Sequence, residues 1–273
     1  MQHEIIIEAG RTESQYWRDL MRYRELFYFL AWRDVLVRYK QTVIGILWAL
    51  VRPVLTLLIF VFIFSKVAKL PAHGMPYPVM VFAGVLPWQL FSTSLTECST
   101  SLISNSNLIS KVYFPRLIVP ASAVIVSLVD FAISFGLLAL LMIFYHVWPT
   151  WHLLALPFFT LLALIASTGA GLWLAALNVE YRDFRYVVPF FVQLGLYVSP
   201  VGFSSALVPA KWQLLYSLNP MVGVIDGFRW ALFGGANALY TPGLVMSIIL
   251  SIAMLVSGAY YFRHTEREFA DII

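Results

Sequence analysis

Long apolar stretches constrain this chain more than any other feature of its sequence. A helix must hold about 20 consecutive apolar residues to cross the roughly 30 Å hydrocarbon core of a bilayer. Hydrophobic residues make up 60% of the chain and charged residues only 12%, which excludes a water-soluble globule. The sequence therefore predicts an all-α polytopic membrane protein. Six stretches are long and apolar enough to be its transmembrane helices: about 44–65, 79–102, 117–145, 153–177, 187–203 and 242–262.

These spans divide the chain into three parts. Residues 1–43 are predicted to be a cytoplasmic N-terminus, 44–262 the transmembrane domain and 263–273 a cytoplasmic C-terminal tail. The N-terminal part is expected to contain an amphipathic helix in the membrane interface, because apolar residues recur on one face at helical spacing. Those residues are Tyr16, Leu20, Tyr23, Phe27 and Leu30.

A further apolar region, about 204–241, differs from the six spans. It is interrupted by Pro209, Asn219-Pro220 and Gly234-Gly235, and residues of these types end helices. The pattern predicts a pair of short helices before the last span rather than a seventh crossing.

The basic residues predict the orientation of the spans. Cytoplasmic loops of membrane proteins carry an excess of Lys and Arg. With both termini in the cytoplasm, most of the 18 Lys and Arg residues fall in cytoplasmic segments. Membrane topology therefore explains the formal net charge of +4, and no nucleic-acid partner is predicted.

Three ionisable residues fall inside predicted spans, where each is costly unless it is paired or hydrated. Arg52 and Glu97 lie at similar depths from the cytoplasmic ends of the first two spans. An ion pair between them is the favoured interpretation, and a gating or substrate contact is the alternative. Asp130 lies near the middle of the third span and shares a helical face with Ser127 and Ser134. It is a polar packing contact, a channel-lining group or a proton carrier.

Small residues recur every four positions in the fourth span, at Ala163, Ser167, Gly171 and Ala175. Such a stripe lets another helix approach closely, so it predicts a helix-packing face.

The sequence lacks the residue patterns of an ATPase or of a metal site. No Gly-Lys dipeptide occurs, so there is no phosphate-binding P-loop. Cys98 is the single cysteine, and no group of Cys and His residues has metal-ligand spacing. Neither an enzymatic activity nor a cofactor is therefore expected in this chain.

Three stretches, taken together in their order and spacing, resemble a known family. They are RDVLVRYKQTVIGILWALVRP (33–53), NSNLISKVYFPRLIVP (105–120) and SLNPMVGVIDGFRWALFG (217–234). Jointly they look like the membrane subunit of ABC-type bacterial polysaccharide exporters, which move O-antigen, capsular polysaccharide or teichoic acid. The resemblance covers about residues 25–265.

This resemblance implies that the chain works in a larger assembly. Two copies would form a channel in the bacterial inner membrane, and two separate ATP-binding cassette ATPase subunits, which hold the ATP and Mg²⁺, would bind underneath. The implied substrate is O-antigen polysaccharide linked to undecaprenyl pyrophosphate. The alternatives are export of capsular polysaccharide or teichoic acid, and a gradient-driven flippase for lipid-linked glycans.

The resemblance also implies where this chain meets its ATPase. A cytoplasmic coupling helix at about 104–116, between the second and third spans, would dock on that subunit. The candidate contacts are Asn107, Leu108, Lys111, Tyr113, Phe114 and Arg116.

Two further sites follow from the same resemblance. The pair of short helices at about 204–241 would be re-entrant and form a periplasmic gate with Trp212, Tyr216, Asn219, Pro220, Asp226 and Arg229. A local ion pair between Asp226 and Arg229 is the simpler account of those two charges. The anionic lipid head group would be held at the cytoplasmic entrance by Arg33, Arg38 and Lys40, unless these residues only anchor the topology.

Overall fold

The computed structural model describes residues 13–40, 45–67, 75–181, 183–234, 239–266 and 269. Every regular element within these ranges is helical, as the apolar stretches predict. The α-helices are α1 (Glu13–Arg22), α2 (Arg24–Lys40), α3 (Gly45–Phe60), α4 (Tyr77–Ser104), α5 (Ser106–Ile109), α6 (Ile118–Phe144), α7 (Leu156–Glu180), α8 (Phe184–Val198), α9 (Ala210–Tyr216), α10 (Pro220–Leu232) and α11 (Thr241–Thr265). Shorter helical turns are η1 (Val61–Val67), η2 (Trp151–Ala155) and η3 (Ser205–Leu207).

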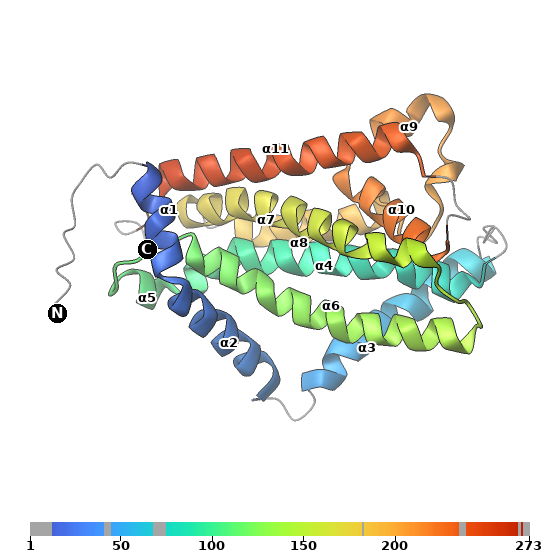
Figure 1. Cartoon of the computed structure of the whole chain (residues 1–273), viewed down its shortest axis with the longest axis horizontal. Coiled ribbons are helices and arrows are strands. Elements are labelled where there is room, and N and C mark those ends of the chain that lie inside the picture. The colour runs from blue at the N-terminus through green and yellow to red at the C-terminus, as the bar shows by residue number, and fades with distance from the viewer. Residues whose placement is uncertain are drawn as a thin grey trace.

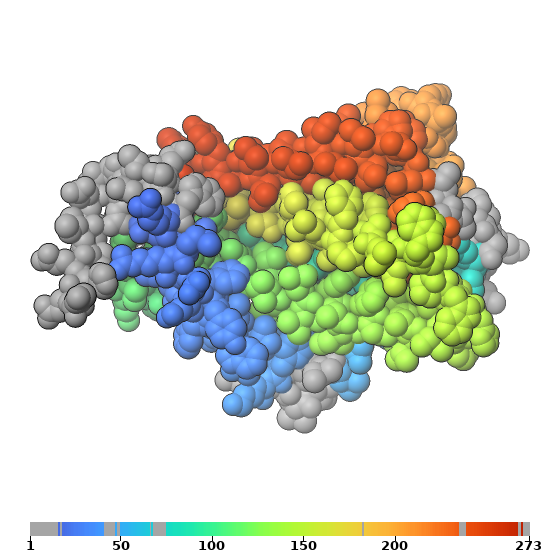
Figure 2. All heavy atoms as spheres, viewed as in Figure 1, coloured from blue at the N-terminus to red at the C-terminus, as the bar shows by residue number. Residues whose placement is uncertain are grey.

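The long helices α4, α6, α7 and α11 lie side by side along the long axis of the molecule (Figure 1). Each is long and apolar enough to cross a membrane, α7 together with the η2 turn before it. α4 is the central helix. Of its most apolar 18-residue stretch, 72% is buried inside the protein, compared with 22% for the corresponding stretch of α11. Figure 2 shows α6, α7 and α11 together covering one face of the molecule.

The first and fifth predicted spans are present as shorter apolar helices. α3 has 16 residues and α8 has 15, each less than the roughly 20 that a straight crossing needs. α8 ends at Val198 because Pro200 disfavours helical backbone at Ser199, which is extended. The structure therefore supports four candidate spans, and the six-span count stays a prediction.

The amphipathic N-terminal segment covers one end of the bundle. α1 lies across the end that also holds α5 and the last turn of α11, hereafter the α5 end (Figure 1). Leu20, Tyr23 and Phe27 pack against the core there and Leu30 is buried, so the predicted apolar stripe faces the protein.

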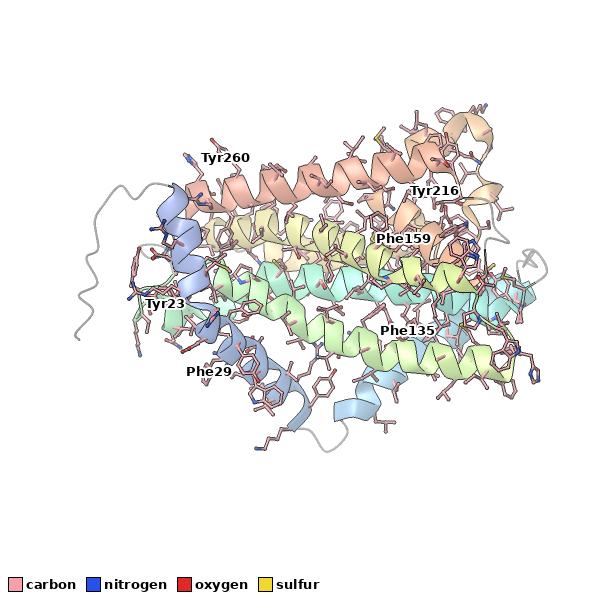
Figure 3. All side chains as sticks on the ribbon, viewed as in Figure 1. Tyr23, Phe29, Phe135, Phe159, Tyr216 and Tyr260 are labelled. Atoms are coloured by element: carbon pink, nitrogen blue, oxygen red, sulfur yellow. The ribbon has the colours of Figure 1, made fainter. Side chains whose placement is uncertain are left out.

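The second half of α2 departs from the predicted interfacial helix. It slants along α6, with Phe29 and Trp32 exposed and with Arg33 and Arg38 turned towards α4 and α6. Figure 3 shows Phe29 projecting away from the bundle. An apolar outer face and a charged inner face suit a helix that is surrounded by lipid rather than by water.

The predicted small-residue stripe on α7 is a packing face, as expected. Ala163, Ser167, Gly171 and Ala175 are all buried. A methyl group added at Gly171 would lie 2.7 Å from the side chain of Cys98, so this face meets α4. On the other side of α7, Gly169 touches the backbone of α11, an approach that the stripe does not predict.

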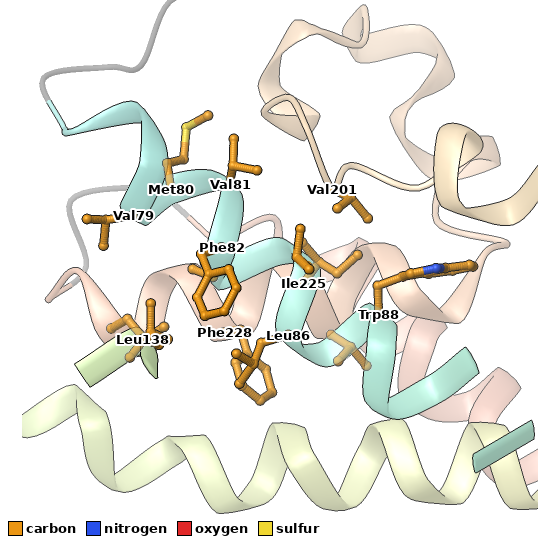
Figure 4. Close-up of a cluster of buried hydrophobic side chains, with 14 of the residues drawn as sticks. Val79, Met80, Val81, Phe82, Leu86, Trp88, Leu138, Val201, Ile225 and Phe228 are labelled. Atoms are coloured by element: carbon orange, nitrogen blue, oxygen red, sulfur yellow. The ribbon is translucent and has the colours of Figure 1, made fainter. Parts of the chain in front are cut away.

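The region that the sequence predicts to be broken forms two short helices, α9 and α10, at the end of the bundle opposite α5, hereafter the α9 end. α10 begins at Pro220, and the side chain of Asn219 caps it by accepting a 3.0 Å hydrogen bond from the backbone N–H of Met221. α10 packs into the main core, where Ile225 and Phe228 lie among side chains of α4 and α6 (Figure 4).

Candidate functional site

Arg38 joins α2 to two carboxylates that lie within the helix bundle. Its Nη1 lies 3.3 Å from Glu97 Oε1 on α4 and 3.3 Å from Asp130 Oδ2 on α6. The hydroxyl of Tyr39 donates a further hydrogen bond to Asp130. Asp130 is in the middle of α6, about 18 Å along the helix from Ile118 at 1.5 Å per residue, as the sequence predicts.

The predicted ion pair between Arg52 and Glu97 is therefore wrong. Glu97 pairs with Arg38 instead, and in the described part of the chain no ion pair reaches Arg52. The prediction failed because it placed Arg38 in a juxtamembrane segment outside the spans. α2 carries Arg38 alongside α6 to the depth of Asp130, where it reaches both carboxylates.

Two cavities meet at Arg38 and form a polar track between α2, α4 and α6. The first, hereafter the Arg52 cavity, has a volume of about 280 Å³, and its polar lining is Arg38, Tyr39, Arg52, Gln89, Ser92, Thr93, Ser127, Asp130 and Ser134. The second has a volume of about 500 Å³, and its polar lining is Arg33, Asp34, Arg38, Glu97, Thr100, Ser101, Ser104 and Asn105. Ser127, Asp130 and Ser134 share one helical face, as predicted, and that face lines the first cavity.

The three residues predicted to hold a lipid head group have different environments. Arg33 pairs with Asp34 at 2.7 Å and donates a 2.7 Å hydrogen bond to Asn105 Oδ1, which ties α2 to the end of α4. Arg38 lies deeper, between the two cavities. Lys40 is exposed at the last residue of α2. Only Arg33 and Arg38 border the polar track.

The predicted coupling helix is much shorter than 104–116. α5 is one turn, Ser106–Ile109, and an irregular segment follows to Leu117. Pro115 disfavours helical backbone at Phe114, which excludes helix near the end of the predicted range. Of the predicted contacts, Asn107, Lys111 and Tyr113 are exposed and Leu108 is half-buried.

The other two predicted contacts point into the protein. Phe114 is 4% exposed and packs in the core at the α5 end, so it offers no surface to a docked subunit in this conformation. Arg116 binds the residue that follows α11: its backbone N–H donates a 2.8 Å hydrogen bond to Glu266 Oε1, and its guanidinium donates to the Glu266 carbonyl.

A junction at the α5 end joins three segments that are distant in sequence. Arg116 and Glu266 link the α5–α6 segment to α11, while the Arg263 guanidinium of α11 lies 4.2 Å from the centre of the Tyr16 ring of α1. Burial raises the pKa of the Glu266 carboxyl, and the hydrogen bond from Arg116 opposes that rise. Burial and the nearby Glu266 raise the pKa of Tyr16. No local sequence pattern predicts these contacts.

At the α9 end, Arg229 is a buried clamp rather than half of a local ion pair. It is 2% exposed and donates to the carbonyls of Val201 and Phe203 at 2.8 Å each and of Met80 at 3.3 Å. Among the described residues no salt bridge joins it to Asp226, which is hydrogen-bonded to Ser205, although the two opposite charges still attract each other.

The remaining predicted gate residues hold α9 and α10 against the end of α8. The Tyr216 hydroxyl donates to the Val198 carbonyl at 2.8 Å, and the Asn219 amide donates to Ser199 Oγ at 2.8 Å. Pro220 starts α10, and Trp212 is half-exposed on α9. Among the residues that the structure describes, no group of His, Cys, Asp and Glu side chains is arranged to hold a metal ion.

Comparisons with known proteins agree with this architecture. A family model described as ABC-2 type transporter matches residues 25–233. The chain is 30% identical over 259 residues to the O-antigen export system permease protein RfbA of Myxococcus xanthus, covering 94% of this chain and 98% of that one. It is 26% identical over 248 residues to the RfbA permease of Klebsiella pneumoniae, covering 88% and 92%.

A more distant relative carries a different name. The Polysialic acid transport protein KpsM of Escherichia coli is 22% identical over 204 residues, which is 74% of this chain and 79% of KpsM. The family match and these relatives confirm the resemblance noted in the sequence. The chain therefore belongs to the ABC-2 type transporter membrane family and is a permease subunit of such a transporter.

Proposed function

We propose that this chain is the channel-forming permease subunit of an ATP-driven exporter that moves undecaprenyl-pyrophosphate-linked O-antigen polysaccharide across the bacterial inner membrane. One observation carries the proposal: the 30% identity to an O-antigen export permease extends over nearly the whole of both chains. The matched 259 residues extend along the helices that carry the polar track and along the α9–α10 pair.

The channel would form between two copies of the chain. α3 and α8 would be the first and fifth of six spans, and both expose apolar side chains that lipid or a second copy would cover. Examples are Leu55 and Leu58 on α3, and Phe190, Phe191 and Leu194 on α8. Both termini would be cytoplasmic, which places the α5 end in the cytoplasm.

ATP and Mg²⁺ would be bound by two partner ATPase subunits at the α5 end. The exposed residues Asn107, Lys111 and Tyr113, with half-buried Leu108, would contact them. A push on this segment would reach α11 through the hydrogen bonds between Arg116 and Glu266. The coupling contact would therefore be linked to the last span without a continuous helix between them.

The helices α9 and α10 would form a re-entrant gate on the periplasmic side. The Arg229 clamp holds α10 to the start of α4 and to the segment after α8, so it would keep the resting gate in place. Opening would require these three carbonyl contacts to shift together.

A capsular polymer is the second candidate substrate, and it is favoured by the similarity to the polysialic acid transport protein. A teichoic acid exporter would use the same assembly. A gradient-driven flippase is less well supported, because Asp130 is paired with Arg38 and is therefore poorly suited to carry protons.

Native mass spectrometry tests the proposed assembly. The tagged chain would be extracted from its native host in mild detergent and measured with the proteins that accompany it. We expect two copies of the chain with two P-loop ATPase subunits. A stable single chain or homo-oligomer without an ATPase would contradict an ATP-driven exporter and favour the gradient-driven flippase.

A further inference from the structure

We propose that the Arg52 cavity binds the phosphate groups of a polyprenyl lipid head group, with Arg52 as the principal ligand and the Ser127 hydroxyl as a second one. This assignment rests on the proposed function, since it says where the diphosphate of the exported lipid would lie. It differs from the entrance site predicted from sequence, because neither Arg33 nor Lys40 borders this cavity.

Arg52 supplies the first observation. It is the only charged residue of α3, an otherwise apolar helix. Its side chain is exposed and lines the cavity, and within the described ranges no carboxylate forms an ion pair with it. A guanidinium in an apolar helix is costly unless an anion or water accompanies it. Its planar fork matches a phosphate, to which it can donate two hydrogen bonds at once.

Ser127 supplies a second, independent observation. It is fully buried on α6 and lines the same cavity, yet its hydroxyl has no hydrogen-bond partner among the described residues. Ser122 on the same helix behaves in the ordinary way and donates to the carbonyl of Val119 at 2.9 Å. On the opposite wall, Thr93 donates to the carbonyl of Gln89 at 2.6 Å. Among the described residues the Ser127 hydroxyl is thus left without an acceptor, and in this proposal a phosphate oxygen in the cavity becomes that acceptor once the side chain turns to meet it.

Arg38 and Asp130 explain how such a site could release its ligand. Arg38 is shared between two carboxylates at 3.3 Å each, so its bonds to them are long. A diphosphate, with one negative charge on each of its two phosphates, would compete for it, while the Asp130 carboxylate on the cavity wall would repel the same ligand. Attraction by the arginines and repulsion by Asp130 would therefore oppose each other, as in a transport site that must both hold and release its ligand.

The surroundings favour a lipid over a free anion. Apolar side chains of Pro53, Leu86 and Phe131 line the cavity beside the two arginines. The helices that border it turn apolar residues outward, as Phe29 on α2 and Leu55 on α3 show. A polyprenyl chain would extend over these faces while its head group lies inside. Inorganic pyrophosphate has no apolar chain, so it would contact the arginines but not these apolar faces.

The test measures binding to the full chain in nanodiscs, together with any ATPase that co-purifies. The probes are undecaprenyl pyrophosphate, inorganic pyrophosphate and undecaprenol, which lacks the phosphates. We expect Arg52→Gln to weaken undecaprenyl pyrophosphate at least about ten-fold and Ser127→Ala about three- to ten-fold, since each removes a hydrogen bond to a charged group. Undecaprenol binding should be the same in all variants.

Ser94→Ala is the matched control. Ser94 is also a fully buried serine whose hydroxyl has no hydrogen-bond partner in the part of the chain described, but it does not line the cavity. We expect this variant to keep the parental affinity. Arg52→Lys keeps the charge and should restore part of the affinity, which separates loss of a ligand from loss of the fold.

Three results would overturn the assignment. They are unchanged affinity in Arg52→Gln, equal losses in Ser94→Ala and Ser127→Ala, and inorganic pyrophosphate binding as tightly as the lipid, which would indicate a free-anion site. A failed site is distinguishable from a failed function. If Arg52→Gln binds normally while cells lacking the chain still accumulate lipid-linked glycan, only the site is wrong.

Discussion

Arg229→Ala is expected to destabilise the purified protein by about 3 kcal/mol, as a single-site change at the α9 end. The reason is the number of groups that lose their partner together. Arg229 satisfies the backbone carbonyls of Met80, Val201 and Phe203. Alanine would remove all three of these hydrogen bonds and leave the buried Val201 carbonyl without this donor, besides leaving a cavity where the guanidinium packed.

The measurement is thermal unfolding of the detergent-solubilised chain, followed by its tryptophan fluorescence. The melting temperature of Arg229→Lys should lie between those of the parental protein and Arg229→Ala. The lysine ammonium keeps the positive charge, but it lacks the planar fork with which the guanidinium reaches three carbonyls. Lys211→Ala, on the exposed surface of α9, is the matched control and should change stability by less than about 0.5 kcal/mol. Equal melting temperatures for Arg229→Ala and Lys211→Ala would contradict the clamp.

Gly258→Ala is expected to disrupt the packing of α11 against α7. A methyl group at Gly258 would lie 2.2 Å from the carbonyl oxygen of Gly169, and one at Gly169 would lie 2.4 Å from the backbone N of Leu255. Because the obstructing atoms are backbone, no side chain can turn aside to admit the methyl group. The helices must separate, and we expect a cost of about 1–3 kcal/mol, rising further for Gly258→Leu.

Gly136→Ala makes a matched control for this experiment. Gly136 lies in the interior of α6, and a methyl group there would meet no atom within 4 Å. Alanine should therefore stabilise the helix by about 0.5–1 kcal/mol through its higher helix propensity. Opposite signs for the two glycine substitutions, measured as shifts in melting temperature, are the expected result. A neutral Gly258→Ala would mean that α7 and α11 are not in backbone contact.

Local sequence was sufficient to predict much of the architecture. Apolar length alone places α4, α6, α7 and α11, because burial of backbone hydrogen bonds in lipid forces such stretches into helices. Helix-breaking chemistry at Asn219-Pro220 predicts the start of α10. The four-residue spacing of small residues predicts the α4-facing side of α7.

Residue partners were harder to predict, because they depend on where helices cross. The sequence places Arg52 and Glu97 at similar depths, but similar depth does not determine whether Arg52 or Arg38 pairs with Glu97. The path of α2 along α6 brings Arg38 there, and that path follows from tertiary packing. Gly169 was missed for the same reason, since it lies off the four-residue stripe and contacts α11 instead of α4.

Among the candidate site residues, too, positions set by helical geometry were predicted, whereas the packing of a loop residue was not. Asp130, Ser127 and Ser134 share a face because helical geometry fixes their spacing, and the structure confirms it. Phe114 was predicted as a surface contact because the sequence of a short loop does not say which side chains turn inward.

Cells that lack this chain give the most direct measurement of the proposed export of a lipid-linked glycan. Undecaprenyl-linked glycan would be extracted from the mutant and from the mutant carrying the wild-type chain, and surface glycan would be measured in both. The proposed function predicts that the lipid-linked polymer accumulates on the inner side of the membrane and that surface glycan falls, with both restored by the wild-type chain. Normal surface glycan without intracellular accumulation would contradict it.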